Sequence, residues 1–174
     1  MKSAPRLARP RLELAALRRR AGDDRGAYEL LMETAQAVPT AMPLLAAPLT
    51  ELAAAVGKRE EVSELLRANY EGTHSLDVLD GIAVLEPDSE AARERYVQHL
   101  QREPSLVAAT KWLAGEKLEH EQFHPDVQRA LEHATKPLTR YRCAACGFES
   151  KQHFWQCPGC QAWDSYPPRR VEEL

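Results

Sequence analysis

The last fifth of the chain contains two short sequences, YRCAACGF at residues 141–148 and WQCPGCQAW at residues 155–163, which hold all four of its cysteines. Each Cys-x-x-Cys turn directs two sulfurs toward one point about 2.3 Å away, and Gly147 or Pro158 supplies the turn geometry. Two such turns complete a tetrahedron. The spacing therefore predicts one tetrathiolate-bound metal ion, held by Cys143, Cys146, Cys157 and Cys160.

Two other uses of these cysteines compete with metal binding. Four cysteines can form two disulfides, as in small secreted domains, or a Cys-x-x-Cys pair can act in thiol redox chemistry, as in thioredoxin. No charged and then apolar segment with a small-residue cleavage site opens the chain, and the motif lies in no βαβ pattern. The context therefore favours a metal.

The predicted metal shell is closed, because four thiolates leave no position for water or substrate, and closed shells are typical of structural zinc. Residues 140–174 form a segment shorter than the roughly 40 residues that a chain needs to bury a sufficient core. Metal binding, worth about 10–16 kcal/mol in comparable peptides, would have to fold this segment.

Aromatic residues are concentrated around the cysteines. We expect six of the chain's eleven aromatics to form the core of the metal module and to shield its sulfurs; they are Tyr141, Phe148, Phe154, Trp155, Trp163 and Tyr166. His153 lies among them and is predicted to be a surface histidine, not a fifth ligand, because four cysteines already complete the shell.

The rest of the chain has the composition of an ordinary soluble protein, with a net charge of −3 and 44% hydrophobic residues. The longest apolar run, Ala41 to Leu49, is nine residues long and contains two prolines. This is well below the roughly 18 residues that a membrane span needs, so the sequence predicts no direct span in this chain.

Residues 7–139 show helical periodicity and no alternating strand pattern. Glycine and proline interrupt this region regularly and predict eight helices in four hairpins; the interruptions are Gly22, Pro39, Gly57, Gly72, Pro87, Pro104, Pro125 and Pro137. Pro48 falls inside the third predicted helix, which should therefore start late or kink.

The hairpins repeat at intervals of about 34 residues, the period of tetratricopeptide repeats. The sequence GDDRGAYELL at residues 22–31, followed by Pro39, has the turn, the small alanine and the closing proline of that pattern. We therefore predict an all-α fold, a tetratricopeptide-like solenoid of about four hairpins over residues 1–137, followed by a metal-stabilised zinc-ribbon module over residues 138–174. The short connection at residues 135–139 predicts that the module packs on the apolar face of the last helix, at Val127, Ala130, Leu131 and Ala134.

Charged residues suggest few specific sites. Seven Lys or Arg residues lie between Lys2 and Arg20 against the single acidic residue Glu13, so the first helix is basic; it is either a binding face or, as we favour, a solvated helix. The acidic pairs Glu60-Glu61 and Glu172-Glu173 are predicted to be solvated surface.

Helical hairpins followed by these two cysteine sequences resemble the carboxy-terminal half of the lipopolysaccharide assembly protein B family, whose rubredoxin-type metal module is similar to residues 141–163. The resemblance covers nearly the whole chain. It implies that the four cysteines bind the metal and that the protein is a non-enzymatic adaptor in the regulation of lipopolysaccharide synthesis. The implied protein partners, bound through the repeat groove, are a membrane-bound AAA protease and the deacetylase of the lipid A pathway.

The resemblance also implies a location. Members of the family have an amino-terminal anchor, which residues 1–7 do not match, that holds the repeats on the cytoplasmic side of the inner membrane. This part of the protein is therefore expected in the cytoplasm, and the full-length parent is expected to be anchored to the inner membrane.

Three alternative functions remain open. In rubredoxin-like electron transfer the metal would be iron, but only ten residues separate the two turns and Gln161 stands where the second turn would have a glycine, so zinc is favoured over iron. A nucleic-acid-binding zinc ribbon would need a basic surface, whereas residues 140–174 hold five Lys or Arg against four Asp or Glu. Some family members have been labelled as sugar transferases, but the sequence contains no recognisable phosphate loop, nucleophile elbow or carboxylate pair. We therefore predict no enzymatic activity and no nucleic-acid partner.

Overall fold

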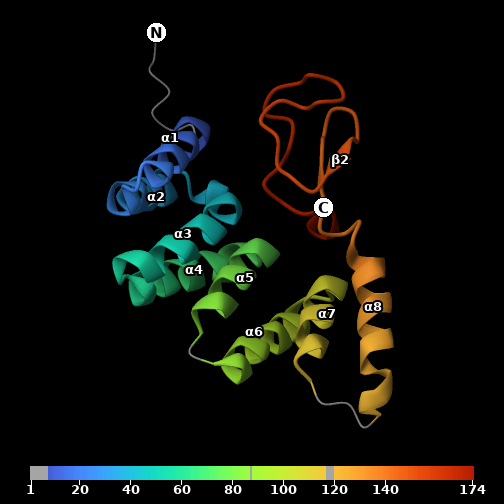
Figure 1. Cartoon of the computed structure of the whole chain (residues 1–174). Helices are drawn as coiled ribbons and strands as arrows, with labels where there is room; N and C mark the ends of the chain where they lie inside the picture. Colours follow the sequence, from blue (N-terminus) through green and yellow to red (C-terminus); the bar gives the residue numbers. More distant parts are fainter. Residues whose placement is uncertain (1–7, 87, 117–119) are drawn as a thin grey trace. The chain divides into compact units, whose positions relative to one another are not determined.

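The computed structural model describes residues 8–86, 88–116 and 120–174, and it groups the chain into two compact units, residues 1–85 and 86–174 (Figure 1). Within the described residues the chain forms eight α-helices and one two-stranded sheet. The predicted fold class is confirmed: the chain is mostly helical and ends in a small zinc-ribbon region. The predicted breaker Pro87 and the basic residues Lys2 and Arg6 lie outside the described residues.

The first unit is a series of antiparallel helices that each contact the next one along the chain. Helix α3 also contacts α5, as stacked hairpins require, because alternate helices then lie side by side. The elements are α1 (Ala8–Arg20), α2 (Asp24–Ala37), the 3-10 helix Pro39–Ala41, α3 (Met42–Val56), α4 (Arg59–Thr73) and α5 (Leu76–Leu85).

Glycine and aspartate set the turns between these helices. Gly22 has a φ of +81° and Gly57 a φ of +71°, a left-handed conformation that glycine adopts at little cost. Asp23 caps α2, because its side chain accepts a hydrogen bond of 2.9 Å from the backbone N–H of Gly26. The turn predicted at residues 22–23 is therefore confirmed.

The core of the first unit is aliphatic. Its fully buried side chains come from α2 to α5 and include Leu31, Leu45, Leu49, Val62, Leu66 and Leu79. Helix α5 approaches its neighbours closely at Gly81, where a β-carbon would lie 2.9 Å from Cδ1 of Leu66 and 3.3 Å from Cβ of Ala46. A larger residue at position 81 would push the helices apart.

The segment Pro39–Val56 is long and apolar enough to cross a membrane by length and composition, and half of it is buried inside the first unit. Its Leu45, Ala46 and Leu49 are fully buried against neighbouring helices of the first unit. Pro48 lies inside α3, which begins six residues earlier at Met42. A late start of this helix, one of the two predicted outcomes, is therefore wrong.

The second unit contains three further helices and the cysteine-containing segment. Helix α7 contacts both α6 and α8. Ser105 caps α7 by accepting a hydrogen bond of 2.9 Å from the backbone N–H of Ala108. The elements are α6 (Ser89–Arg102), α7 (Leu106–Ala114), the 3-10 helix Glu121–Phe123, α8 (His124–Thr135), β1 (Tyr141–Arg142), β2 (Glu149–Ser150) and the 3-10 helix Val171–Glu173.

Candidate metal centre

The first Cys-x-x-Cys turn joins strands β1 and β2, which pair antiparallel with Tyr141 opposite Ser150. The turn is closed by two backbone hydrogen bonds: the N–H of Cys143 donates to the carbonyl of Phe148 at 2.9 Å, and the N–H of Gly147 donates to the carbonyl of Cys143 at 2.9 Å. Gly147 has a φ of +77°, which is why the residue after the second cysteine of this turn is a glycine.

The second turn repeats the first with a different residue at the left-handed position. The N–H of Cys157 donates to the carbonyl of Ala162 at 2.9 Å, and the N–H of Gln161 donates to the carbonyl of Cys157 at 2.8 Å. An antiparallel β-bridge between Gln156 and Trp163 closes this segment. Gln161 has a φ of +61°. Gln161 therefore adopts the same left-handed backbone conformation as Gly147, at the cost of strain that a glycine would not have.

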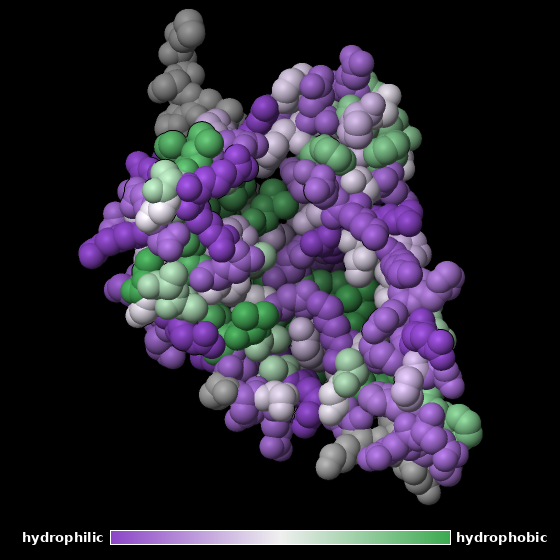
Figure 2. Space-filling view, in the orientation of Figure 1, coloured by the Kyte–Doolittle hydropathy of each residue, from purple (hydrophilic) through white to green (hydrophobic). Residues whose placement is uncertain are grey.

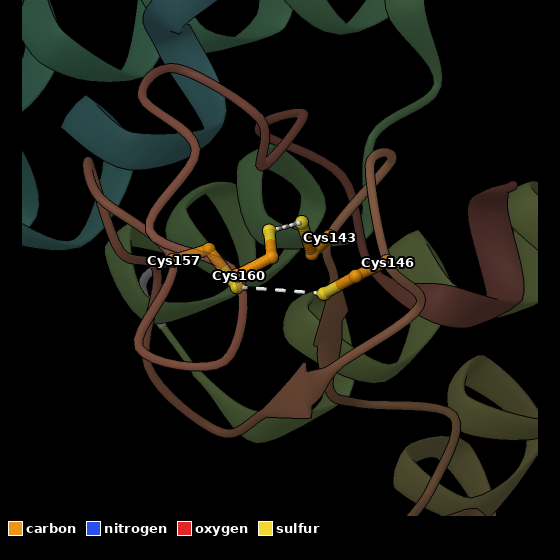
Figure 3. Close-up of side chains that lie close together, drawn as sticks. All are labelled: Cys143, Cys146, Cys157 and Cys160. Atoms are coloured by element: carbon orange, nitrogen blue, oxygen red, sulfur yellow. Dashed lines mark hydrogen bonds between the residues drawn. The ribbon is translucent and has the colours of Figure 1, made fainter.

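The four sulfurs converge on one point (Figure 3). The Sγ atoms of Cys143 and Cys160 lie 3.8 Å apart, those of Cys146 and Cys157 lie 3.7 Å apart, and all four lie within 4.8 Å of one another. A regular tetrahedron with metal–sulfur bonds of about 2.3 Å has edges of about 3.8 Å, so the donor set fits one tetrahedral ion. All four cysteines are free, which excludes the disulfide interpretation for this structure.

Polar groups around the Cys143 sulfur favour its ionised form. The hydroxyl of Ser165 lies 3.2 Å from Cys143 Sγ, and the backbone N–H groups of Cys146 and Ala145 also point to this sulfur. The Ser165 hydrogen bond is the largest cause that lowers the pKa of Cys143 to about 6. Ser165 comes from the segment after the second turn, and sequence spacing alone gave no signal for it.

The other two perturbed cysteines follow the same logic. Burial opposes ionisation of Cys157, but the backbone N–H groups of Cys160 and Gly159 offset it, so the pKa of Cys157 is lowered. The backbone N–H of Phe148 favours the Cys146 thiolate, yet the hydrogen bond with Cys160, burial and the remaining sulfurs raise the pKa of Cys146 to about 12. Four thiolates at this spacing need a cation, because their mutual repulsion keeps at least one sulfur protonated without it.

The site has a buried side and an exposed side. The first cysteine of each turn, Cys143 and Cys157, is buried, whereas Cys146 and Cys160 are exposed. Phe148 and Trp163 are also exposed, by 44% and 55% of their surface, so these two of the six predicted core aromatics are not buried.

His153 lies at the centre of the aromatic cluster. Its ring makes edge contacts with Trp155 at 4.7 Å and with Tyr141 at 5.4 Å, and its Nε2 lies 3.1 Å from the carbonyl oxygen of Tyr166. The ring is half-buried, so the prediction of a surface histidine is wrong. Burial is the main cause that lowers the pKa of His153, and the neutral imidazole therefore belongs to the core.

Two further buried aromatics hold the module together. The hydroxyl of Tyr166 donates a 3.1 Å hydrogen bond to the carbonyl of Phe148, and burial is the largest cause that raises the pKa of Tyr166 to about 12. The Arg170 guanidinium lies 4.0 Å from the ring centre of Tyr141, on which it stacks as a cation–π pair.

The carboxy-terminal tail connects the metal module to the helices of the second unit. Glu172 accepts hydrogen bonds from the Ser105 hydroxyl at 2.8 Å and from the backbone N–H groups of Leu106 at 2.6 Å and Val107 at 3.2 Å. The carboxylate thus satisfies free donors at the start of α7. The prediction that Glu172 is solvated surface is wrong, because a contact so distant in sequence leaves no local pattern.

The module does not cover the predicted face of α8. Val127 is 39% exposed, and Ala130 and Ala134 are exposed as well. The helix instead turns another face to α7, where His124 Nε2 lies 3.0 Å from the carbonyl of Leu113. The predicted burial of aromatics on the apolar stripe of α8 is therefore wrong.

Comparisons with known proteins agree with this site. The sequence model of a family described as the rubredoxin metal binding domain matches residues 141–168. Lipopolysaccharide assembly protein B of Escherichia coli (strain K12) is 28% identical over 123 residues, which are 66% of this chain and 32% of that protein. Lipopolysaccharide assembly protein B of Haemophilus influenzae (strain ATCC 51907) is 26% identical over 88 residues, which are 48% of this chain and 22% of that protein.

The resemblance predicted from the sequence is thereby confirmed, and with it a four-cysteine site suited to one metal ion in a rubredoxin-like zinc ribbon. The chain spans about a third of the length of the curated Escherichia coli relative that it matches, 32%. Both relatives are named as assembly proteins, not as enzymes.

Proposed function

We propose that this chain is part of a non-enzymatic adaptor that regulates lipopolysaccharide synthesis by binding protein partners. The observation that carries the proposal is the combination, in one chain similar to lipopolysaccharide assembly protein B, of stacked helical hairpins with a closed four-cysteine site. Stacked hairpins offer extended surfaces for binding other chains, and a tetrathiolate shell offers no open position for a substrate.

In this proposal the metal is a structural zinc ion bound by Cys143, Cys146, Cys157 and Cys160. A bound zinc ion would supply no redox chemistry, and its charge would let the four thiolates hold the two turns together. Ser165 and the nearby backbone N–H groups stabilise negative charge on the Cys143 sulfur, and His153 packs in the aromatic core of the module. The module would comprise residues 138–174 and the hairpin repeats residues 1–137.

The proposed partners are the membrane-bound AAA protease and the lipid A pathway deacetylase. The adaptor would hold the deacetylase where the protease can degrade it, with this part of the protein in the cytoplasm and the full-length parent anchored to the inner membrane. The proposal rests on the similarity to lipopolysaccharide assembly protein B.

The test is the half-life of the deacetylase in cells that carry the full-length parent with Cys146→Ser. Loss of the metal site should lengthen this half-life, provided that the variant accumulates to the level of the unmodified protein. Ala145→Ser is the matched control, because it places the same residue at the adjacent exposed position without removing a ligand. An unchanged half-life in Cys146→Ser would contradict the proposed mechanism.

Electron transfer by bound iron is a second candidate, and the exposure of Cys146 and Cys160 favours it, because electrons pass most readily through ligands near the surface. Metal analysis of the isolated protein separates the two candidates. Zinc at one equivalent supports the structural role, whereas iron with reversible reduction supports electron transfer.

A further inference from the structure

A separate apolar pocket opens in the first unit, at the junction of α1, α2 and α3. Its volume is about 300 Å³, and its walls include Leu12 and Ala16 of α1, Leu31 of α2, and Pro48 and Leu52 of α3. In the space-filling view, hydrophobic surface lies between hydrophilic residues over these helices (Figure 2). The apolar side chains that line this pocket have no packing partner on the side that faces it.

Pro48 links this pocket to a local cost in the helix. The residue removes one backbone hydrogen bond from the interior of α3, and its ring lines the pocket. A residue that breaks a local rule without an evident gain in packing is expected mainly at functional positions. Pro48 does not stabilise α3, so we attribute its presence to its place in the wall of the pocket.

Two arginines in the last turn of α1 also line the pocket. Arg19 forms an ion pair with Glu51 of α3. Arg20 is exposed, and within the described part of the chain no acidic side chain pairs with it. The helix dipole favours a cation such as Arg20 at the carboxy terminus of α1. The dipole does not explain why an apolar pocket lies beside this arginine.

The charge of α1 limits the kind of molecule that the pocket could bind. Its described residues hold five arginines and one acidic residue, Glu13. A guanidinium at the rim of an apolar pocket matches a ligand with an apolar group next to a carboxylate, which arginine binds through two parallel hydrogen bonds.

We infer that the pocket between α1 and α3 binds a peptide segment of a partner protein that places one large apolar side chain within a few residues of an Asp or Glu. This inference rests on the proposed adaptor function and specifies the chemistry of the segment that the adaptor captures. The apolar side chain enters among Leu12, Ala16 and Leu52, and the carboxylate pairs with Arg20.

The size of the pocket favours a peptide over a lipid. Ligand sites usually range from about 300 to 1,000 Å³, and this pocket, at about 300 Å³, lies at the lower limit. One side chain fits that volume better than a set of acyl chains. A single unpaired guanidinium also suits one carboxylate better than a phosphate headgroup, which presents several charged oxygens to be satisfied.

The test measures binding of short fluorescein-labelled peptides to the 174-residue chain by fluorescence anisotropy. The probe is an eight-residue peptide with the central sequence Phe-Glu in a Gly-Ser background. Two comparison peptides carry serine in place of the phenylalanine or glutamine in place of the glutamate. Vesicles of phosphatidylglycerol serve as the lipid arm. We expect the Phe-Glu peptide to bind at least about tenfold more tightly than either comparison peptide.

Four variants connect binding to the pocket. Ala16→Leu fills it and Arg20→Glu reverses its rim charge, and each should weaken peptide binding at least about tenfold. Ala47→Leu makes the same change at an exposed residue of α3 that does not line the pocket, and Arg11→Glu makes the same charge change elsewhere on α1; both should stay within about twofold of the unmodified chain. Arg20→Glu changes an exposed residue, so it tests the inference even where Ala16→Leu impairs folding.

The inference is overturned if no peptide binds, if vesicles bind and the peptide does not, or if the two pocket variants bind as tightly as their controls. Its failure is distinct from that of the adaptor function. If the full-length parent with Arg20→Glu still shortens the deacetylase half-life, the adaptor function stands and the pocket assignment is wrong.

Discussion

The carboxylate of Glu172 accepts a 2.6 Å hydrogen bond from the backbone N–H of Leu106, so the third-last residue of the chain caps a helix that lies far upstream in the sequence. The neighbouring backbone reinforces this contact, because the N–H of Val171 donates to Arg140 at 2.7 Å and that of Glu172 to Leu138 at 3.2 Å. Folding of the segment around Val171 and Glu172 and folding of the start of α7 therefore depend on each other within the second unit.

Glu172→Gln should lower the stability of the second unit by about 1–3 kcal/mol, because charge-assisted hydrogen bonds to the helix start are lost. Hydrogen exchange at residues 106–110 should become faster, while residues of the first unit stay protected. Glu121→Gln, the same change at an exposed residue of this unit, is the control and should alter neither quantity. Equal exchange rates in the two variants would show that the contact does not stabilise α7.

Cys143→Ser or Cys160→Ser should remove one equivalent of metal and unfold mainly residues 140–174, since that segment has little core of its own. Hydrogen exchange should show loss of protection around Trp155 and Trp163 and retained protection in the buried helices α3 and α4. Chelation of the metal from the unmodified chain should give the same pattern. Protection that persists around the two tryptophans without metal would contradict this dependence.

Gln161→Gly should stabilise the metal-bound module by about 1 kcal/mol, because the backbone at this position has a φ of +61° and glycine relieves the strain. Gln152→Gly is the matched control. Gln152 is an exposed residue of the same module without a positive φ, so the same change there should lower stability by about 0.5–1 kcal/mol. Urea unfolding followed by tryptophan fluorescence measures both; destabilisation in both variants would exclude strain at position 161.

His153 should make the module sensitive to acid. Burial lowers the pKa of this histidine from its ordinary value of 6.5, so the folded state prefers the neutral ring. The stability that this preference contributes is fully present above pH 6.5 and is lost as the pH falls through the lower folded pKa. His153→Gln should therefore lose less stability than the unmodified chain between pH 7.5 and about pH 5, measured by thermal unfolding with excess zinc. His133→Gln, at an exposed position of α8, should keep the full loss, and parallel behaviour of the two variants would argue against His153 as the origin.

The helices were predictable because their signals are local. Gly22 and Gly57 adopt the left-handed conformations that end helices. Asp23 and Ser105 cap helices by accepting a hydrogen bond from a backbone N–H only three residues further along the chain. The convergence of the cysteines was predictable for the same reason, since each turn fixes two sulfurs over a few residues. Apart from the start of α3, the wrong predictions concern contacts between segments that are distant in the sequence.

Glu172 and His153 illustrate this limit. A glutamate beside another glutamate near a chain end has the pattern of solvated surface, and only the folded chain brings it to the start of α7. A histidine among aromatics looks the same in sequence whether it faces water or the ring of Trp155. The apolar stripe of α8 was recognisable, but periodicity does not say which neighbour covers it, and Val127 stays exposed.

The alternation of buried and exposed cysteines gives the metal site a single chemical entrance. Chelators, thiol reagents and competing soft metal ions all meet Cys146 and Cys160 first, whereas Cys143 and Cys157 lie behind them. Exchange of the ion would then proceed in two stages, with the outer pair released while the inner pair still holds the metal. An ion bound there would therefore be reached from the side of Cys146 and Cys160, ahead of the buried cysteines Cys143 and Cys157.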